Sequence, residues 1–338
     1  MSNFRSLPRA VTTITPQRVG FAGGGTDFPA FYRRHGGAVL SSAIDKYIYV
    51  TVKRHSSLFN ENYRLSYSKT EHVDGLDDIE NDIARECLRL VDVEPPLFIA
   101  TASDLPVSSG LGSSSSFAVG LLYALHTLRG EDVSAGQLAE EACHVELSVL
   151  GHPIGKQDQY AAAFGGLNYI SFQQDDRVHL DSLWLPGNGS DGLFRNIMLF
   201  WTGIQRDANA VLREQNENIQ RTGETLIRMR DMAAQCRDLL LNDPEDIKQF
   251  GELLDAGWNA KRSLADTIAS SETDRLYDLA RKGGAVGGKI AGAGGGGFLL
   301  LLVPAEKRDQ VRAALTGMMD VPVAYEPRGA RLLSVVPG

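Results

Sequence analysis

Residues 106–130, "PVSSGLGSSSSFAVGLLYALHTLRG", join a loop of glycine and serine to an apolar segment without a break. The composition of the loop alone is typical of a flexible linker between domains. After Gly112, however, apolar residues recur every three or four positions from Phe117 to Leu128, which is the spacing of an amphipathic helix. Gly130 ends this run. We therefore predict a shaped loop that leads directly into a helix.

The start of this helix is suited to bind an anion. The first turn of a helix exposes unpaired N–H groups and the positive end of the helix dipole. Gly110 and Gly112 would let the backbone turn tightly enough to aim these groups at a phosphate. The hydroxyls of Ser113 and Ser114 would bind the same anion or a Mg²⁺ ion. An ordinary serine-capped helix is the alternative. Because no lysine follows Gly112, the loop is not the G-x-x-x-x-G-K-[ST] pattern.

Length and composition are those of a globular protein with room for two domains. The chain has 338 residues, of which 43% are hydrophobic. Its net charge of −8 argues against nucleic acid as a main partner. The longest apolar run, residues 298–303, is too short to span a membrane, and the first 15 residues lack the apolar core of a signal peptide. Three widely spaced cysteines fit reduced thiols, so we expect a cytoplasmic protein without a membrane partner.

The secondary-structure signals mix strands and helices without the strict alternation of a doubly wound sheet, which predicts an α+β fold. The β-rich segments of the first half are residues 10–15, 38–54, 63–68 and 97–103, and its helical patterns are residues 78–91, 113–128 and 134–150. The second half is expected to contain a strand at 196–203, helices over 206–282, a buried strand at 296–303, a helix at 305–318, and short strands near 321–325 and 331–336.

A domain boundary is predicted at the segment "WLPGNGSDGLF" (184–194), whose proline and glycines are typical of a linker. We expect an N-terminal domain of residues 1–188 and a C-terminal domain of residues 189–338.

Glu146 is the strongest candidate for a functional carboxylate. On the predicted helix 134–150 it shares a face with residues that are otherwise apolar or small. A carboxylate on such a face costs free energy unless a cation or several donors meet it. Glu146 is therefore either part of a structural salt bridge, on a helix rotated slightly toward water, or a ligand of Mg²⁺, which prefers oxygen donors.

Asp158 is a second candidate, because it opens an alanine-rich helix after a loop of glycine and proline. It could simply cap that helix. Alternatively, the positive charge of Lys156, two residues earlier, would hold Asp158 ionised and ready to act as a base.

Two further glycine-rich segments allow close approach of a ligand or of another backbone. In "TPQRVGFAGGGTDFP" (15–29), Arg18 and Asp27 could grip a polar ligand or form a structural pair. In "GGKIAGAGGGGF" (287–298), the G-x-G-x-x-G spacing is met, but a strand follows the glycines instead of preceding them. This order is wrong for a dinucleotide-binding loop. The segment is better suited to support the phosphate loop or to pack a strand closely on a helix.

The three glycine motifs in this order, with Glu146 and Asp158 between the second and third, resemble the superfamily of galactokinase, homoserine kinase, mevalonate kinase and phosphomevalonate kinase, the GHMP kinases. The second motif is "LPVSSGLGSSSS" (105–116), and the resemblance spans nearly the whole chain. It implies an N-terminal domain like ribosomal protein S5 and a ferredoxin-like C-terminal domain. ATP and substrate would meet in the cleft between them.

The resemblance also implies a role for each matching residue. Asp158 would accept the proton of the substrate hydroxyl, Lys156 would add positive charge near the transferring group, and Glu146 with Ser114 would hold Mg²⁺. ATP would be bound by Pro106, Ser108, Ser109, Gly110, Leu111, Gly112, Ser113, Ser114 and Ser115, with Gly292, Gly294 and Gly295 supporting the loop. The substrate would be bound by Arg18, Gly24, Gly25, Thr26 and Asp27, together with Arg206.

One departure narrows the substrate. Galactokinases carry Gly-Glu-His-Thr-Asp where this chain has "GGGTD" (23–27), so Gly24 and Gly25 replace the Glu and His that grip the sugar. Residues 23–50 and 201–215 are most similar to the D-glycero-D-manno-heptose 7-phosphate kinases. Such a substrate brings its own phosphate and needs a cation, for which Arg206 is one candidate. Solvated arginine is the alternative there.

The expected function is that of an ATP- and Mg²⁺-dependent sugar kinase. It would phosphorylate the anomeric hydroxyl of the heptose 7-phosphate to the 1,7-bisphosphate, on the route to nucleotide-activated heptose for lipopolysaccharide and other surface polysaccharide. The alternatives are a kinase for an unphosphorylated sugar such as fucose or galactose, and a catalytically silent sugar sensor. The carboxylates Glu146 and Asp158 count against the sensor, because binding alone does not require them.

Overall fold

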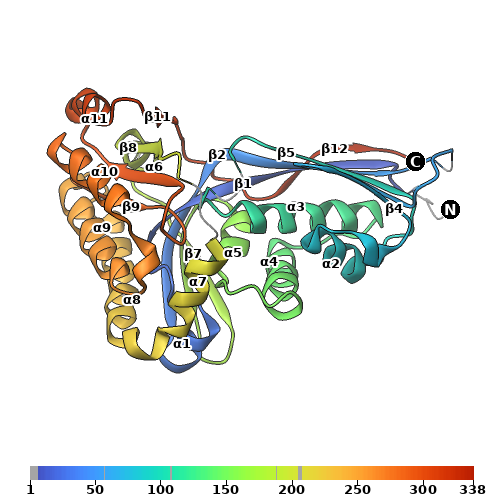
Figure 1. The fold of residues 1–338 in the computed structure, drawn as a ribbon, viewed down its shortest axis with the longest axis horizontal. Helices are drawn as coiled ribbons and strands as arrows, with labels where there is room; N and C mark the ends of the chain where they lie inside the picture. Colours follow the sequence, from blue (N-terminus) through green and yellow to red (C-terminus); the bar gives the residue numbers. More distant parts are fainter. Residues whose placement is uncertain (1–6, 57, 107–108, 188, 205–207) are drawn as a thin grey trace.

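The computed structural model describes residues 7–56, 58–106, 109–187, 189–204 and 208–338. Within these ranges the strands form two sheets, at opposite ends of an elongated molecule (Figure 1). The larger sheet has the order β12-β1-β2-β5-β3-β4, with β6 and β7 joined to it through β2, and the smaller has the order β11-β8-β10-β9. Both sheets are antiparallel except for the parallel pair of β3 and β5, and this mixture of mainly antiparallel sheets with helices confirms the predicted α+β class.

The larger sheet is built on two long antiparallel strands, β1 and β2. Its strands are β1 (Ala10–Ala22), β2 (Gly37–Arg54), β3 (Tyr63–Ser66), β4 (Thr70–Val73), β5 (Leu97–Ser103), β6 (Leu167–Phe172), β7 (Val178–Ser182) and β12 (Arg331–Val336).

Helices cover one face of this sheet (Figure 1). They are α2 (Asp82–Val91), α3 (Ser113–Leu128), α4 (Ala135–Cys143) and α5 (Gln157–Phe164), while α1 (Pro29–His35) connects β1 to β2. The predicted helix after the glycine–serine loop is α3, and it lies at the centre of the layer, packed on β1 and β2. Its side chains are buried on most of its circumference, which fixes the position of its N-terminus in the fold.

The smaller sheet has the topology expected of a ferredoxin-like domain. Its strands are β8 (Ile197–Trp201), β9 (Gly287–Ile290), β10 (Phe298–Leu302) and β11 (Met319–Asp320). When these four strands are numbered 1 to 4 along the chain, their order across the antiparallel sheet is 4-1-3-2. The helices of this half are α6 (Gly189–Arg195), α7 (Ala208–Glu217), α8 (Ile219–Asn242), α9 (Ile247–Arg262), α10 (Ser271–Lys282) and α11 (Arg308–Ala314). Every residue of β10 is buried, which accounts for its continuous apolar sequence.

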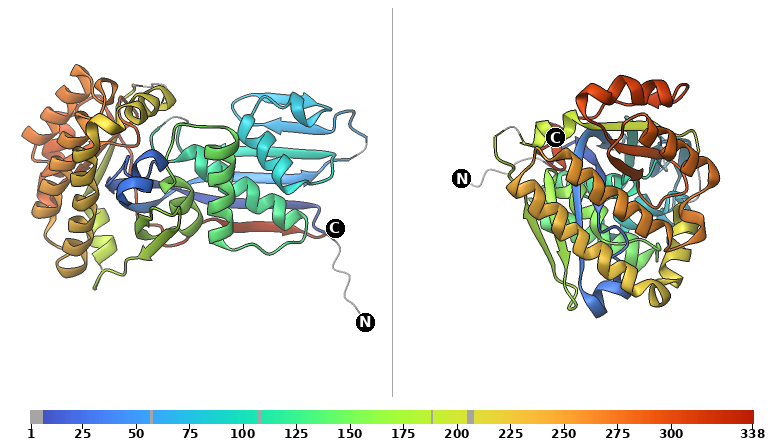
Figure 2. Two further views of the ribbon diagram at one scale, coloured as in Figure 1. Left: turned by 90° about the horizontal axis from the view of Figure 1, so that it is seen from below. Right: turned by 90° about the vertical axis from the view of Figure 1, so that its left-hand side faces the viewer.

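The two halves share a hydrophobic core. Side chains of β1 and β2, such as Phe21 and Ile44, pack in one cluster with Phe250 of α9 and Phe298 of β10. The rings of Phe21 and Phe250 meet edge to face with their centroids 5.6 Å apart. The C-terminal helices stand beside the ends of β1 and β2 (Figure 2). The glycine turn that follows β1 is therefore held at the junction of the two halves.

The structure differs from the sequence-based expectations at the end of the chain. The last strand of the smaller sheet is Met319–Asp320 instead of 321–325, where Tyr325 forms only an isolated bridge with Ile44. Strand β12 pairs with β1 in the larger sheet, so residues 331–336 lie outside the C-terminal domain to which we assigned them. Their leucine and valine residues predict a strand but not which sheet it joins. The boundary at residues 188/189 itself stays a prediction.

Within the described ranges, none of the helices has the length and apolar character needed to cross a membrane.

Candidate active site

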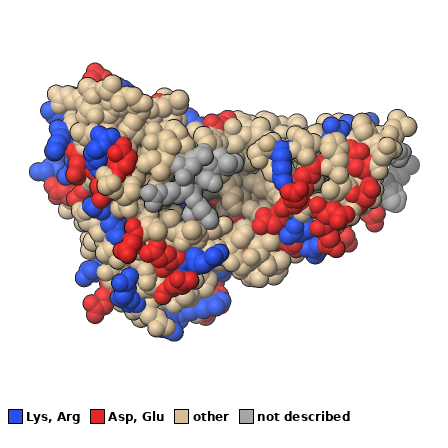
Figure 3. Space-filling model, viewed as in Figure 1, with Lys and Arg blue, Asp and Glu red and all other residues tan. Residues whose placement is uncertain are grey.

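A cavity of about 270 Å³ lies where the two halves of the molecule meet. The space-filling view shows this face hollowed between the C-terminal helices and the N-terminal half (Figure 3). Seven segments of the described chain line the cavity: the end of β1 with its glycine turn, the loop before α3 with the start of that helix, the turn that carries Glu146, residues 152–158, the helix α7, the helix α9 through Lys261, and the region of the third glycine motif. All three motifs therefore converge on one site, although some 270 residues separate the first from the third in the sequence.

The glycine–serine loop forms a tight turn that ends in the helix α3. Gly110 and Gly112 have φ values of +81° and +80°, which favour glycine, and α3 begins at Ser113. Gly112, Ser113 and Ser114 line the cavity, so the N-terminus of α3 opens onto it. This geometry is suited to bind an anion, and anion binding stays the prediction for this loop.

The third glycine motif lies directly behind this loop. A Cβ atom placed on Gly292, where φ is +65°, would lie 2.6 Å from the carbonyl oxygen of Gly110. A Cβ atom on Gly110 would lie 2.7 Å from the oxygen of Ala291. Side chains at either position would push the two backbones apart. The absence of side chains thus lets the third motif support the loop before α3.

Glu146 is fully buried at the edge of the cavity, on a turn of π-helix (His144–Val149) that continues α4. Its carboxylate accepts hydrogen bonds from Ser114, from Ser115 at 2.7 Å, and from Nε2 of Gln159 at 2.7 Å. Burial raises the pKa of this carboxyl, against the effect of these donors. Within the part of the chain that the structure describes, Glu146 forms no ion pair. The sequence predicted its burial but not the π-helical turn, which is a feature often found at functional sites.

The donor set around Glu146 fits a Mg²⁺ ion. A carboxylate without a cation and two serine hydroxyls provide oxygen ligands of the kind that Mg²⁺ prefers. Among the described residues, no group of three or more Asp, Glu, His or Cys side chains forms a complete metal cage. This agrees with the usual Mg²⁺ site, in which one or two protein oxygens share the ion with phosphates.

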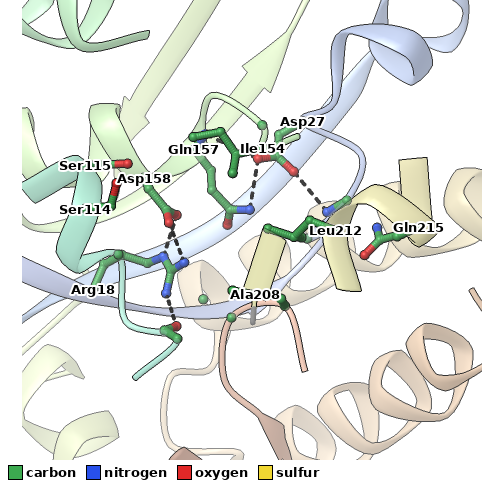
Figure 4. Close-up of a pocket in the computed structure, with 18 of the residues that line it drawn as sticks. Arg18, Asp27, Ser114, Ser115, Ile154, Gln157, Asp158, Ala208, Leu212 and Gln215 are labelled. Carbon is green, nitrogen blue, oxygen red and sulfur yellow. Dashed lines mark hydrogen bonds and ion pairs between the residues drawn. The ribbon is translucent and has the colours of Figure 1, made fainter. Parts of the chain in front are cut away.

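Asp158 is paired with Arg18, not with Lys156. The guanidinium of Arg18 donates from Nε to Oδ1 at 2.7 Å and from Nη2 to Oδ2 at 2.8 Å (Figure 4). Its third bond, from Nη1, goes to the carbonyl of Gly110 at 2.8 Å. Arg18 thus ties Asp158 to the phosphate loop in a charge-assisted, two-point contact.

The predicted catalytic role of Lys156 is wrong. Its Nζ atom lies 3.4 Å from the backbone oxygen of Asp176, 3.9 Å from Glu140, and over the ring of Tyr32. It does not line the cavity. Lys156 immediately precedes α5, whereas Asp158 lies in its first turn, so the two side chains point in different directions. Proximity in sequence was therefore a poor guide to charge pairing.

Asp27 lies across the cavity from Asp158 and is almost fully buried. It accepts hydrogen bonds from the backbone N–H of Gly25 at 2.9 Å and from Nε2 of Gln157 at 2.9 Å (Figure 4). Burial, followed by the nearby charge of Asp158, raises its pKa. The first glycine motif and the start of α5 are thereby held together around one carboxylate.

Two buried lysines that the sequence analysis missed also line the cavity. Lys261 of α9 donates to the carbonyl of Gly292, and Lys289 of β9 approaches the carbonyl of Phe21 at 3.5 Å. Within the described residues neither forms an ion pair with a carboxylate. Burial, followed by the charge of Arg18, lowers the pKa of Lys261 to about 8. Burial and the charge of Lys261 also lower the pKa of Lys289.

A sequence signal for Lys261 did exist. It follows Phe250, Leu254 and Trp258 on one face of α9, and all three are buried. A charged residue on an apolar helical face was the signal that identified Glu146, and it applies equally here. Lys289 stands between glycine and isoleucine in a short strand, where no comparable pattern exists.

The remaining predicted residues are placed as follows. Ser109, Ser115, Gly24 and Gly25 line the cavity. Pro106, Leu111, Thr26, Gly294 and Gly295 do not, while Ser108 and Arg206 lie outside the described residues.

Three of these residues instead hold the fold around the site. Leu111 is buried in the shared core, and the hydroxyl of Thr26 bonds the backbone of Ala38. The backbone N–H of Gly295 donates to Ile268 at 2.7 Å.

Comparisons with known proteins agree with this geometry. Residues 80–166 match the family model described as GHMP kinases N terminal domain, and residues 233–321 match GHMP kinases C terminal. The D-glycero-alpha-D-manno-heptose 7-phosphate kinase of Campylobacter jejuni is 30% identical over 317 residues, covering 90% of this chain and 93% of that one. A mevalonate kinase of Thermococcus onnurineus is 30% identical over 71% of this chain and 70% of its own.

Solved structures show the same fold. A D-glycero-D-manno-heptose 1-phosphate kinase from Bacteroides thetaiotaomicron superposes with a TM-score of 0.78 and 26% identity, covering 96% of this chain and 99% of that one. A galactokinase of Lactococcus lactis shares the fold at a TM-score of 0.73 and 19% identity, with 95% of each chain covered. The chain belongs to the GHMP kinases, and it is an ATP-dependent phosphotransferase with an alcohol group as acceptor.

Proposed function

We propose that this GHMP kinase transfers the γ-phosphoryl group of ATP to the anomeric hydroxyl of D-glycero-D-manno-heptose 7-phosphate and forms the 1,7-bisphosphate. The reaction would serve the synthesis of nucleotide-activated heptose for lipopolysaccharide and other bacterial surface polysaccharide. The similarity to the heptose 7-phosphate kinase of Campylobacter jejuni over 90% of the chain supports this substrate.

The position of Asp158 is the observation that carries the proposed mechanism. Its carboxylate lies in the cavity against the phosphate loop, since a Cβ atom on Gly112 would be 3.4 Å from Oδ2. A sugar hydroxyl bound between Asp158 and the N-terminus of α3 would be positioned for attack on a phosphate held there. Asp158 would accept the hydroxyl proton, while the two-point contact with Arg18 orients the carboxylate.

The residues around α3 would neutralise the charge of the transferring group. Backbone N–H groups at the start of α3 would face the phosphates of ATP. Glu146 and Ser114 would hold Mg²⁺ through the oxygen atoms described above. A bound Mg²⁺ ion would withdraw charge from the phosphate oxygens in the transition state. Phosphoryl transfer requires mainly this positioning and charge stabilisation.

The two buried lysines favour a substrate that carries its own phosphate. Burying an ammonium group without a carboxylate partner is costly, so an anionic ligand should complete the site. Lys261 lies between the third and the first glycine motifs. Its Nζ atom donates a hydrogen bond to Gly292 behind the phosphate loop, and it lies 3.8 Å from a Cβ atom placed on Gly24. With an unphosphorylated sugar such as fucose or galactose, the phosphates of ATP would be the anions available to these lysines.

Replacing the base tests the mechanism. Asp158→Asn should lower kcat by about 10²- to 10⁴-fold, because the amide cannot accept the proton, while ATP still binds at the unaltered loop. Steady-state kinetics and calorimetric titration with ATP measure the two effects.

The exposed pair of Asp176 with Arg33 offers a matched control. Asp176→Asn also removes a carboxylate from an arginine, but outside the cavity, and should leave kcat unchanged. An Asp158→Asn enzyme that keeps its wild-type turnover would exclude Asp158 as the base.

A further inference from the structure

Gln215 is a buried amide without a protein partner at the edge of the cavity. It lies near the end of α7 and is only 1% exposed. Within the described part of the chain, neither its Oε1 nor its Nε2 atom forms a hydrogen bond. Both atoms are inaccessible to water in this arrangement. Leaving a buried amide unpaired is unfavourable, and such groups are rare in folded proteins.

The surroundings of Gln215 place its amide in the substrate half of the cavity. It lines the cavity with Leu212 of the same helix (Figure 4). The apolar neighbours Val211 and Leu226 belong to the core of the C-terminal half and offer no hydrogen bond. Asp27, the polar group next to this turn, is already bonded to Gly25 and Gln157. The described residues around the amide therefore leave it without a partner, and a ligand in the cavity is the remaining source of one.

The first glycine motif makes room for this amide. A Cβ atom on Gly25 would lie 2.1 Å from Nε2 of Gln215 and 3.3 Å from its Cδ atom. The φ value of Gly25, +101°, also favours glycine. At Gly24 the added atom would meet nothing nearer than 3.8 Å. Of the two glycines, only Gly25 is in conflict with Gln215, so these two positions depend on each other.

We propose that Gln215 determines substrate specificity by hydrogen-bonding a hydroxyl group of the sugar, and that Gly25 is required because it leaves space for this amide. The inference rests on the proposed action on a sugar. A carboxamide carries both a donor and an acceptor, and a hydroxyl group can satisfy either. In this chain, Gly24 and Gly25 replace the Glu-His pair of the galactokinase motif. The side chain that would bind the sugar there instead comes from α7 of the C-terminal half.

Deoxy sugars test the contact. Gln215→Met keeps the length of the side chain and removes the amide. Its kcat/KM for D-glycero-D-manno-heptose 7-phosphate should fall about 10- to 100-fold, the range for losing one or two hydrogen bonds in a buried site, with KM for ATP unchanged. Wild-type enzyme should lose a similar factor on one monodeoxy analogue of this sugar. The Met variant should be indifferent to that deoxygenation alone.

Two results would overturn the assignment: wild-type kinetics in the Met variant, or unchanged discrimination among the deoxy analogues by that variant. If the wild-type enzyme does not turn over the heptose phosphate, the proposed function fails instead. The same comparison then applies to deoxy analogues of whichever sugar it does phosphorylate, so the two failures are distinguishable.

A double-mutant cycle tests the dependence on Gly25. Gly25→Ala should raise KM for the sugar strongly in the wild-type background and much less in a Gln215→Ala background, because the truncated side chain no longer collides with the new Cβ. The strain of a positive φ is the same in both backgrounds and cancels. Gly317→Ala, at φ +91° with open space around it, controls for that strain. Additive effects of Gly25→Ala and Gln215→Ala would contradict the coupling.

Discussion

At the scale of single residues, the described lining of the cavity includes three acidic and three basic side chains, which differ in how fully they are paired. Arg18 and Asp158 are bound to each other through two short hydrogen bonds, which fix the orientation of the carboxylate. Glu146 is met by neutral donors only. Lys261 and Lys289 have only carbonyl oxygens as partners within the described residues. The charges that lack a partner are those expected to bind a metal ion and phosphates.

The pKa of Lys261 predicts a pH dependence. Because burial and Arg18 lower this pKa to about 8, the ammonium form is present below that pH and is lost above it. We expect kcat/KM for the sugar phosphate to fall as pH rises through about 8. Lys261→Arg, whose guanidinium has a much higher pKa and stays protonated over this range, should move this fall to higher pH. Initial rates between about pH 6.5 and 9.5 measure it, and an identical fall in both enzymes would assign it to another group.

At the scale of elements, the site depends on backbones that approach closely. The loop before α3 is supported by the third glycine motif, and the turn after β1 is held to α5 through Asp27 and Gln157. These contacts join segments from both halves of the chain. The shape of the phosphate loop therefore depends on the assembled fold and not only on the sequence of the loop itself.

The contact between the two glycine motifs can be tested by filling it. Gly292→Ala places a Cβ atom against Gly110, so we expect Kd for ATP to rise about tenfold or more and stability to fall by about 1–3 kcal/mol. Gly187→Ala is the matched control, because Gly187 has a similar φ of +61° but nothing within 4 Å. It should lose a comparable stability and keep its affinity for ATP. Equal Kd values in the two variants would argue against support of the loop.

Local sequence patterns predicted the helices and strands of this site better than the contacts between its side chains. The helix after the glycine–serine loop and the burial of Glu146 followed from spacing, and both are confirmed. The partner of Asp158 was predicted wrongly, because Arg18 lies 140 residues away and no local pattern links them. No local sequence pattern identified Gln215 either, because its proposed role depends on the space beside Gly25, which lies in the N-terminal half.

At the scale of the whole molecule, the cavity exists only where the two halves meet. Its phosphate loop, Glu146 and Asp158 come from the N-terminal half, while Gln215, Lys261 and Lys289 come from the C-terminal half. The halves are joined by a common core and by β12, which returns to the larger sheet. The sequence predicted two α+β domains with a site between them. It did not predict the return of β12, because strand signals do not specify a pairing partner.

The most direct test of the proposed function is a substrate panel assayed with ATP and Mg²⁺. It should compare D-glycero-D-manno-heptose 7-phosphate with the unphosphorylated heptose, fucose and galactose, and ³¹P NMR should locate the new phosphate. We predict that the heptose 7-phosphate has the highest kcat/KM by about 10²-fold or more and is phosphorylated at the anomeric oxygen, because Lys261 and Lys289 favour a phosphorylated substrate. Equal or better turnover of a free sugar, or a new phosphate at another position, would contradict the proposed function.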